Sequence, residues 1–406
     1  MLLLRSVTVN LPVLAYGASI GWMSPMSLLL QSKDSPRGVP LTDIEVSWMA
    51  AMPYLICVPA NSLNAYVVDK FGRKTGLYFV SLAGAASWIF LLISYDLWAL
   101  ILARSLVGVI MSGSYVICPI YTKEISDDSI RGSLGCFEAT KAIAWLRCKP
   151  EKDSLIQEEL NIITNEQEKD KGGNEFLLTS IWSDKTLRKA FEISMVTTLA
   201  REVCGAIPVM NFAGEIFTLA STDGIILSPN QQAMLLGAVQ VLGSILASSV
   251  VDKSGRKPLL FVSSFISGLS MCVLASWFLM RDYEVITPSW IPLLTLCICI
   301  FCDSSGLQPI SMVLMGEIFS FKYRGTVMAT TMSCSSLADF FQLLFFKPLA
   351  NSIGIHVAFY FFGLVCLSMA AYVILVIPET KARSLEDIYK DLAKKQKSKK
   401  DESTGV

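Results

Sequence analysis

The chain has 406 residues, of which 53% are hydrophobic and 17% charged, and its mean hydropathy is +0.52. Ordinary soluble domains carry about 25% charged residues, so this composition excludes a soluble globular protein and indicates an all-α protein that crosses a membrane several times. Basic and acidic residues number 34 each, so the net charge gives no indication of a nucleic-acid partner.

Apolar segments long enough to cross a ~30 Å hydrocarbon core as helices follow one another along most of the chain. A signal peptide is the alternative for the first of them, because Arg5 precedes it, but no small-residue cleavage site follows. We expect ten membrane spans, near residues 7–30, 46–68, 76–94, 97–119, 190–220, 231–251, 258–280, 290–316, 326–349 and 355–377.

Most of the 11 cysteines lie inside these apolar segments, where a thiol acts as a small hydrophobic side chain rather than as half of a disulfide. The nearest approach to a metal motif is "CICIFC" (297–302), in an apolar segment of a chain whose single histidine is His356. We therefore expect no metal site and no cofactor.

Short loops rich in lysine and arginine remain in the cytoplasm. Such loops follow the even-numbered spans, and a lysine-rich tail follows the last span. This pattern predicts that both termini and the segment 131–187 face the cytoplasm. The loops are "DKFGRK" (69–74), "KEISDDSIRG" (123–132), "DKSGRK" (252–257) and "EIFSFKYRG" (317–325).

Two of these motifs occur twice. "VVDKFGRKTG" recurs 183 residues later as "VVDKSGRKPL", and "EISDDSIRG" recurs 193 residues later as "EIFSFKYRG". Any basic turn resembles another to some extent, but chance does not account for two pairs in the same order at similar spacing. The two halves of the chain are therefore predicted to be copies of one unit, as in transporters built from parallel repeats.

The motifs together resemble the facilitative sugar porters of the major facilitator superfamily, and among them the insect trehalose-transporter-like proteins. The resemblance covers nearly the whole chain. It implies a membrane transporter of two pseudo-symmetric helical halves in the plasma membrane, which carries a hexose or trehalose by facilitated diffusion and is not an enzyme. The motifs are "GWMSP" (21–25), "DKFGRK", "RSLVG" (104–108), "PIYTKEI…RG" (119–132), "WLR" (145–147), "DKSGRK", "GEIF…RG" (316–325) and "PETKARSLEDI" (378–388).

One pair of helices of that family is missing from the sequence. In the family "RGSLG" (131–135) opens the fifth span and "WLR" follows the sixth, yet little more than "CFEATKAIA" separates them here. The second copy of the motif, at 324–325, is followed by two apolar spans. Loss of two spans preserves the orientation of everything downstream, whereas loss of one would invert it. A splice variant, a mis-joined gene model and a truncated paralogue all fit this pattern.

These observations divide the chain into four regions. The segment 149–175 is charged, with apolar residues loosely at helical spacing, so either amphipathic helices or a solvated linker is expected there. The regions are an incomplete first half of four spans (1–135), cytoplasmic linker helices (136–187), a second half of six spans (188–380) and a cytoplasmic tail (381–406).

The repeated charged loops provide candidates for a gate on the cytoplasmic side. The resemblance implies that ion pairs among them hold the halves together and break as the carrier changes state. Charges that only set the orientation of the spans are the alternative. The gate residues are Asp69, Arg73, Glu124, Arg131, Asp252, Arg256, Glu317 and Arg324.

Polar side chains inside the spans are candidates for solute binding, because a sugar site is built from amides, carboxylates and aromatic rings. Gly306 and Pro309 match the broken tenth helix of the family, whose unwound turn would let the backbone approach the solute. The substrate-binding candidates are Asn211, Gln240, Asp303, Gln308 and Gln342.

The sequence also departs from the family. The glutamine-rich motif "QQxSGxN" of the seventh span is replaced by "REVCGAI" (201–207), and Met312 stands where a tryptophan is expected. Arg201 and Glu202 either pair with each other or bind a charged solute.

The first span carries no acidic residue of the kind found in proton-coupled relatives, so facilitated diffusion is expected over symport. With the helix pair missing, we expect Arg104 to be exposed to lipid and transport to be impaired. The alternative function is a non-transporting product that acts as a sensor or as a partner of another chain. Neither the oligomeric state nor the identity of the sugar follows from the sequence.

Overall fold

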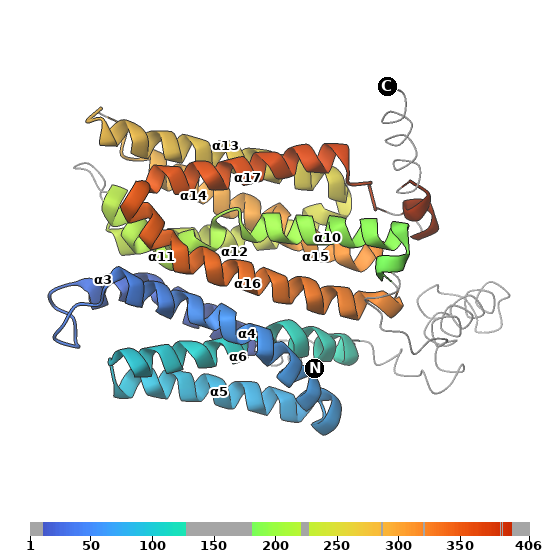
Figure 1. Cartoon of the computed structure of the whole chain (residues 1–406), viewed down its shortest axis with the longest axis horizontal. Coiled ribbons are helices and arrows are strands. Elements are labelled where there is room, and N and C mark those ends of the chain that lie inside the picture. Colours follow the sequence, from blue (N-terminus) through green and yellow to red (C-terminus); the bar gives the residue numbers. More distant parts are fainter. Residues whose placement is uncertain are drawn as a thin grey trace.

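The computed structural model describes residues 11–126, 181–220, 227–285, 287–319, 321–381, 383 and 385–391, and within them the chain forms helices and no strand. The helices run roughly along the long axis of the molecule (Figure 1). In the first half they are α2 (Leu11–Gly21), α3 (Met23–Gln31), α4 (Asp43–Phe71), α5 (Arg73–Ile93) and α6 (Leu97–Ser126). In the second half they are α10 (Lys185–Glu202), α11 (Ala206–Ala220), α12 (Pro229–Ser254), α13 (Arg256–Asp282), α14 (Ile291–Cys302), the π-helical turn η1 (Asp303–Leu307), α15 (Gln308–Ile318), α16 (Phe321–Ile353) and α17 (Ile355–Leu375).

Nine helical segments of the described chain are long and apolar enough to cross a membrane. Pairs of consecutive helices form some of these spans: α2 with α3, α10 with α11, and α14 with α15 through η1. The tenth predicted span, 326–349, lies within the continuous helix α16, which is not among the nine because its many serines and threonines and its charged Asp339 and Lys347 lower its hydropathy. Of the ten predicted membrane spans, nine are therefore helices long and apolar enough to cross a membrane, and the tenth is a continuous helix of lower hydropathy.

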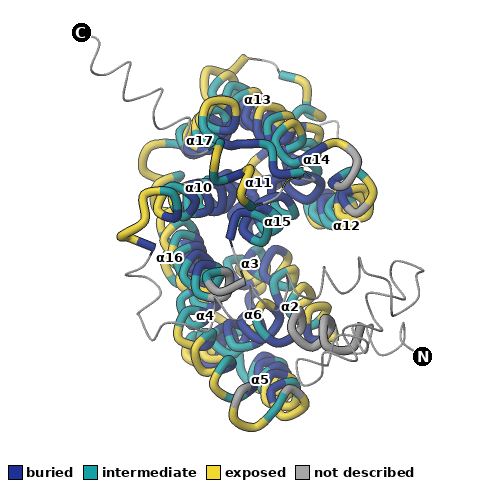
Figure 2. The backbone as a smooth tube through the Cα atoms, turned by 90° about the vertical axis from the view of Figure 1, so that its right-hand side faces the viewer, coloured by how far each residue is buried: buried dark blue, intermediate teal, exposed yellow. Residues whose placement is uncertain are grey.

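The helices form two bundles, seen end-on in Figure 2. In the first bundle α6 packs along both α4 and α5, and in the second α13 packs along α17 and α14. The bundles meet chiefly where α16 lies along α4. This arrangement fits the division into two halves that the sequence repeat predicts.

The repeat is visible in the backbone as well as in the sequence. Thr42 begins α4 with a capping box, in which its side chain accepts from the Glu45 N–H, and Ser228 begins α12 with the same motif. Gly72 ends α4 at φ 89°, and Gly255 ends α12 at φ 87°. Because a positive φ is costly for residues with a Cβ atom, the glycine in each "DKxGRK" loop permits the sharp turn into the next helix.

The motif "RSLVG" fixes the packing of the first bundle. Arg104 on α6 is 1% exposed, and it donates from Nε to the Met49 carbonyl at 3.0 Å and from Nη1 to the Ser19 carbonyl at 2.7 Å. A Cβ atom on Gly108 would lie 2.4 Å from the Pro53 carbonyl oxygen, so the glycine lets α6 approach α4 closely. The expectation that Arg104 faces lipid is therefore wrong, because α2 and α4 already bury it.

The two counterparts of the repeat differ in how much they are covered. Half of the α4 span is buried, whereas only 18% of the α12 span is. The helix that covers α4 is α16, which carries the second "RG" motif near its start, whereas α12 touches the first half mainly through α3. By the symmetry of the repeat, the partner of α12 would be the helix after the first "RG" motif, where the sequence predicts the missing pair.

Candidate solute-binding site

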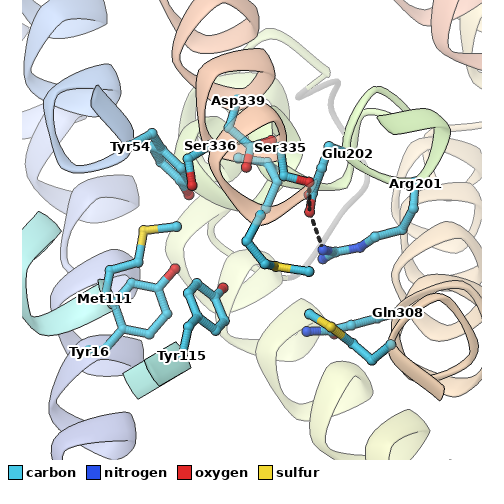
Figure 3. A pocket seen from close by; sticks show the side chains of 13 residues that line it. Tyr16, Tyr54, Met111, Tyr115, Arg201, Glu202, Gln308, Ser335, Ser336 and Asp339 are labelled. Carbon is cyan, nitrogen blue, oxygen red and sulfur yellow. Dashed lines mark hydrogen bonds and ion pairs between the residues drawn. The ribbon is translucent and has the colours of Figure 1, made fainter. Parts of the chain in front are cut away.

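A cavity lies between the two bundles, with side chains from both of them in its lining (Figure 3). The space among these side chains is about 380 Å³ when the part open to solvent is included, but the cavity volume itself is only about 30 Å³, room for about one or two water molecules. Two helical spans are interrupted near the cavity, one at Gly205 and the other at η1. The lining residues are Tyr16, Tyr54, Met111, Tyr115, Arg201, Glu202, Ile207, Gln308, Met312, Met332, Ser335, Ser336 and Asp339.

The first half contributes an aromatic wall. Tyr16 on α2 and Tyr115 on α6 meet edge to face with their ring centroids 6.2 Å apart, and Tyr54 on α4 is 1% exposed. Each tyrosine combines an aromatic face with a hydroxyl group that donates or accepts hydrogen bonds. The wall therefore presents both features that sugar-binding sites use.

The second half contributes the charged groups of the cavity. Arg201 and Glu202 end α10, and Nη1 of Arg201 lies 2.6 Å from Oε1 of Glu202. Nε of Arg201 lies 3.4 Å from Oδ1 of Asp303 in η1. The Ser335 hydroxyl donates to Oε1 of Glu202 at 3.3 Å. Of the two alternatives for Arg201 and Glu202, pairing with each other is what the geometry shows, and Glu202 still faces the cavity.

The break between α10 and α11 positions this pair. Gly205 adopts φ 91°, and a Cβ atom there would lie 2.4 Å from Cδ2 of Phe362. A residue other than glycine would be strained by the backbone and would also clash with α17. The motif "REVCGAI" thus ends α10 with its two charged residues at the depth of the cavity.

The helix that corresponds to the broken tenth helix of the family is interrupted here as well, but the interruption has a different form from the one expected. Asp303–Leu307 form a π-helical turn rather than an unwound one, and Pro309 lies in the first turn of α15. Gly306 packs against α13, where a Cβ atom would meet Oγ of Ser263 at 2.5 Å. In this structure the glycine serves helix packing and does not border the cavity.

The structure separates the five predicted substrate-binding residues. Gln308 lines the cavity, and Asp303 lies behind Arg201. Asn211 is buried and donates to the Ile207 carbonyl of its own helix, while Gln240 is half-buried on α12 and does not line the cavity. The amide atoms of Gln342 are buried and lack partners.

Sequence reasoning missed several lining groups. The three tyrosines lie on three different helices of the first half, so no local pattern joins them. Asp339 lies within the predicted span 326–349 and is not among the predicted substrate-binding residues. The signal that was available for the tyrosines is their position in apolar spans, because the tyrosine hydroxyl group needs a polar partner when it is buried.

At the end of the molecule that carries the "DKxGRK" turns, the second half contains a charged network. Arg256 approaches Glu317 to 2.8 Å through Nη2, and Thr380 donates to the other oxygen of Glu317 at 2.5 Å. Two of the predicted gate residues are thus brought together. The side chains of Asp69, Arg73, Glu124, Asp252 and Arg324, and the whole of Arg131, lie outside the described part of the chain.

Glu379 of the "PET" motif supports the same end. Its carboxylate accepts from the backbone N–H groups of Arg256 at 3.0 Å and Lys257 at 3.2 Å, in the first turn of α13, where a helix offers its N–H groups no acceptor of its own. Burial alone would raise the pKa of Glu379, but these N–H groups and those of Thr380 and Lys381 outweigh it and lower the pKa. The carboxylate therefore acts as a cap for α13.

The opposite end holds a polar cluster that connects the two halves. Lys347 on α16 is 6% exposed, and its Nζ lies 2.8 Å from Glu215, 3.1 Å from Asp43 and 2.9 Å from Gln31. Asp43 also accepts from Gln31 at 2.7 Å and from Asn351 at 2.8 Å. The Lys347 cluster, as we call these five residues, joins α16 and α11 to α3 and α4.

A second, mostly apolar cavity lies on the α12 side of the interface. It holds about 730 Å³ of space free of protein atoms, part of it open to solvent. Its walls come from the junction of α2 with α3, from α11 and from α12. This cavity borders the poorly covered face of α12.

Similar proteins are transporters. A facilitated trehalose transporter of Apis mellifera ligustica is 23% identical over an alignment of 451 positions, which covers 97% of this chain and 88% of the relative. The human solute carrier family 2, facilitated glucose transporter member 6, is 24% identical, with 92% of this chain and 88% of the relative covered.

Solved structures share the fold. The inward-open xylose transporter XylE of E. coli superposes with a TM-score of 0.69 at 18% identity, covering 96% of this chain and 99% of the other. The protein is thus an all-α membrane protein of the major facilitator fold. The model of the family described as "Sugar (and other) transporter" matches residues 14–138 and 136–392. With nearly the whole length matched, the chain belongs to the Sugar (and other) transporter family.

Proposed function

We propose that this protein carries a hexose or trehalose across the plasma membrane by facilitated diffusion, with the central cavity as its solute site. The observation that carries the proposal is the position of this cavity, which lies between the two halves and takes its lining from both. Carriers with parallel repeats bind their solutes at this place and expose them to each side by rocking the halves. The names of the trehalose and glucose transporters support the choice of solute.

The Lys347 cluster supplies the contact that alternating access requires at one end. Lys347 and Asn351 of the second half contact Asp43 and Gln31 of the first half, so separating the halves there would break these interactions. We assign this end to the outside, because the basic loops lie at the other end and such loops remain in the cytoplasm. The described structure is then closed toward the outside.

The predicted cytoplasmic gate becomes a more specific proposal. Arg256, Glu317 and Thr380 connect the start of α13 to the end of α15 and to the segment after α17. We propose that this network, which lies within the second half, positions the repeated charge at 324 to meet those at 69–73 of the first half in the outward-open state. The proposed regions are those of the sequence: a first half at 1–135, a linker at 136–187, a second half at 188–380 and a tail at 381–406.

Two findings support the proposal that the first half lacks its fifth and sixth spans. The family match divides at 136–138, within the stretch where the sequence places the missing pair. The alignment with the honeybee transporter runs over 451 positions although this chain has 406 residues, so the relative contains segments that are absent here. The family match favours a transporter over the non-transporting alternative.

Uptake by purified protein in liposomes tests the proposal. We expect saturable uptake of labelled glucose or trehalose that the unlabelled sugar inhibits. Replacing Gln308 with alanine should raise the KM about tenfold, because it removes a polar contact worth about 1–1.5 kcal/mol.

Gln240→Ala is the matched control, since the same amide is removed from a position on α12 outside the cavity. Its uptake should equal that of the wild type. Absence of saturable uptake by folded protein, or an equal effect of the two variants, would overturn the assignment of the cavity as the sugar site.

A further inference from the structure

The central cavity contains more negative than positive charge. Glu202 and Asp339 line it, and Asp303 contacts Arg201 from behind, so three carboxylates share one guanidinium group. The other buried arginine of the region, Arg104, donates to backbone carbonyls of α2 and α4 and does not line the cavity. In a low-dielectric interior an uncompensated carboxylate is costly, so an imbalance of this kind is relieved either by a positive partner or by a proton.

The unpaired oxygens belong to the residues that face the cavity. Asp339 is 3% exposed and Glu202 is 4% exposed. Neither Oδ1 of Asp339 nor Oε2 of Glu202 has a hydrogen-bond partner in the described structure. The charged groups that act on Asp339 at longer range are Glu202, Arg201 and Asp303, two of them negative. The cavity therefore lacks a positive charge beside Asp339.

The remaining lining suits a cation that also carries hydroxyl groups. Tyr16, Tyr54 and Tyr115 line the wall opposite Arg201 and Gln308 (Figure 3), and aromatic rings attract ammonium groups through cation–π interactions. The hydroxyl oxygen of Tyr54 is also buried and has no hydrogen-bond partner within the described part of the chain. Gln308 and Ser336 provide neutral donors and acceptors of the kind that bind sugar hydroxyls.

We propose that the cavity binds a solute with a protonated amine, of the amino-sugar class, whose ammonium group lies against Asp339 and Glu202. The proposal rests on the proposed function and narrows its substrate class. A neutral sugar would leave both carboxylate oxygens without a positive partner. An ammonium group supplies three donors and one positive charge, which pairs the two unpaired oxygens and offsets one of the two uncompensated carboxylates.

Binding to the purified full-length chain in detergent tests this directly. The probes are glucosamine, glucose and N-acetylglucosamine, measured by calorimetry at a pH below the pKa of the glucosamine amine. N-Acetylglucosamine keeps the nitrogen but removes its charge. We expect glucosamine to bind about tenfold or more tightly than either neutral sugar, because charge-assisted hydrogen bonds are roughly twice as strong as neutral ones.

Asp339→Asn keeps the shape of the side chain and removes its charge. It should lower the affinity for glucosamine to that for glucose while leaving the affinity for glucose within about twofold. Asp282→Asn is the matched control, because it removes the same charge from an exposed residue that pairs with His356 outside the cavity. This variant should keep the preference for the amine.

The outcomes separate this inference from the proposed function. Equal binding of glucose and glucosamine, or an equal loss of both in Asp339→Asn, would overturn the inference and leave the sugar-carrier proposal standing. Binding of glucosamine alone would support the inference and overturn the transport of neutral sugars. Binding of no probe by folded protein would contradict both. Proton uptake on binding of glucose with no preference for glucosamine would show that a proton neutralises Asp339, which also overturns the inference.

Discussion

Lys347 and Arg201 are both buried cations that contact two carboxylates, but they connect different parts of the molecule. Lys347 joins the second half to Asp43 of the first half, and its three closest acceptors lie within 3.1 Å. Arg201 contacts Glu202 beside it and Asp303 in η1, both in the second half. One cation bridges the interface, while the other organises one wall of the cavity.

The two clusters also differ in how completely their polar atoms are paired. Asp43 accepts from Gln31 and Asn351 in addition to Lys347. Around Arg201, by contrast, Oε2 of Glu202 and Oδ1 of the nearby Asp339 are buried and have no hydrogen-bond partner among the described residues. A fully paired network stabilises one arrangement of the halves, whereas unpaired acceptors beside a cavity can still form hydrogen bonds to a ligand. We therefore assign the Lys347 cluster to holding the halves together and the residues around Arg201 to solute binding.

The largest change in stability is expected when the Lys347 cluster loses its cation. Lys347→Met keeps much of the side-chain volume and leaves Glu215, whose side chain is 17% exposed, without its cation. Because removing one partner of a buried ion pair is strongly destabilising, we expect a loss of about 3 kcal/mol, measured as a lower thermal midpoint in detergent.

Lys390→Met is the control for that substitution, since Lys390 forms an exposed pair with Asp387 after α17. It should change stability by less than about 1 kcal/mol. Equal midpoints for Lys347→Met and Lys390→Met would mean that the Lys347 cluster does not hold the halves together.

An effect of opposite sign is expected at the cavity. Asp339→Asn removes a buried charge that has no partner in the described structure, so the ligand-free protein should become more stable by about 1–2 kcal/mol. The measurement is the thermal midpoint without solute. A destabilised Asp339→Asn variant would show that the carboxylate is already paired in the protein and would weaken the contrast between the two clusters.

The smallest effect is expected at Glu379, a carboxylate held by backbone N–H groups instead of a cation. Glu379→Gln should cost less than about 1 kcal/mol at neutral pH, because the carboxylate is only partly buried and the amide oxygen of glutamine can still accept from the N–H groups. The pKa of Glu379 is lower in the folded state, so its contribution is present above the unfolded pKa and is lost as pH falls through the folded value.

The gap in thermal midpoint between wild type and Glu379→Gln should therefore close at acidic pH. A gap that stays constant down to a pH below the folded pKa of Glu379 would contradict the capping role.

The sequence predicted the larger features because they rest on composition and spacing. Apolar segments locate the long helices, and the repeated "DKxGRK" motif marks Gly72 and Gly255 as equivalent turns. "RSLVG" carries an arginine whose burial could not be predicted, since its partners are backbone carbonyls 55 and 85 residues away. Backbone acceptors have no signature in the sequence.

The site was predicted less well, because its residues come together only through packing between helices. Gln240 and Gln308 look equally suitable along the chain, but the rotation of each helix places only Gln308 in the cavity lining. Lys347 lies in a span with many other polar residues, so the sequence does not distinguish it from them. Its acidic partners are 132 and 304 residues away. The roles of these residues depend on the direction in which each side chain points from its helix, which the sequence alone does not give.

Protection of a cavity thiol by solute tests the central claim, that the space between the halves is the solute site. Ser336 lines the cavity and is 4% exposed, so Ser336→Cys in a variant without the 11 native cysteines places one thiol there. The measurement is the rate of its modification in liposomes by a small thiol reagent, with and without saturating glucose or glucosamine. The account predicts that at least one of these sugars slows the modification severalfold, whereas sorbitol at the same concentration does not. Equal rates in the presence and absence of both sugars, in protein that still takes up sugar, would place the solute elsewhere and contradict the account.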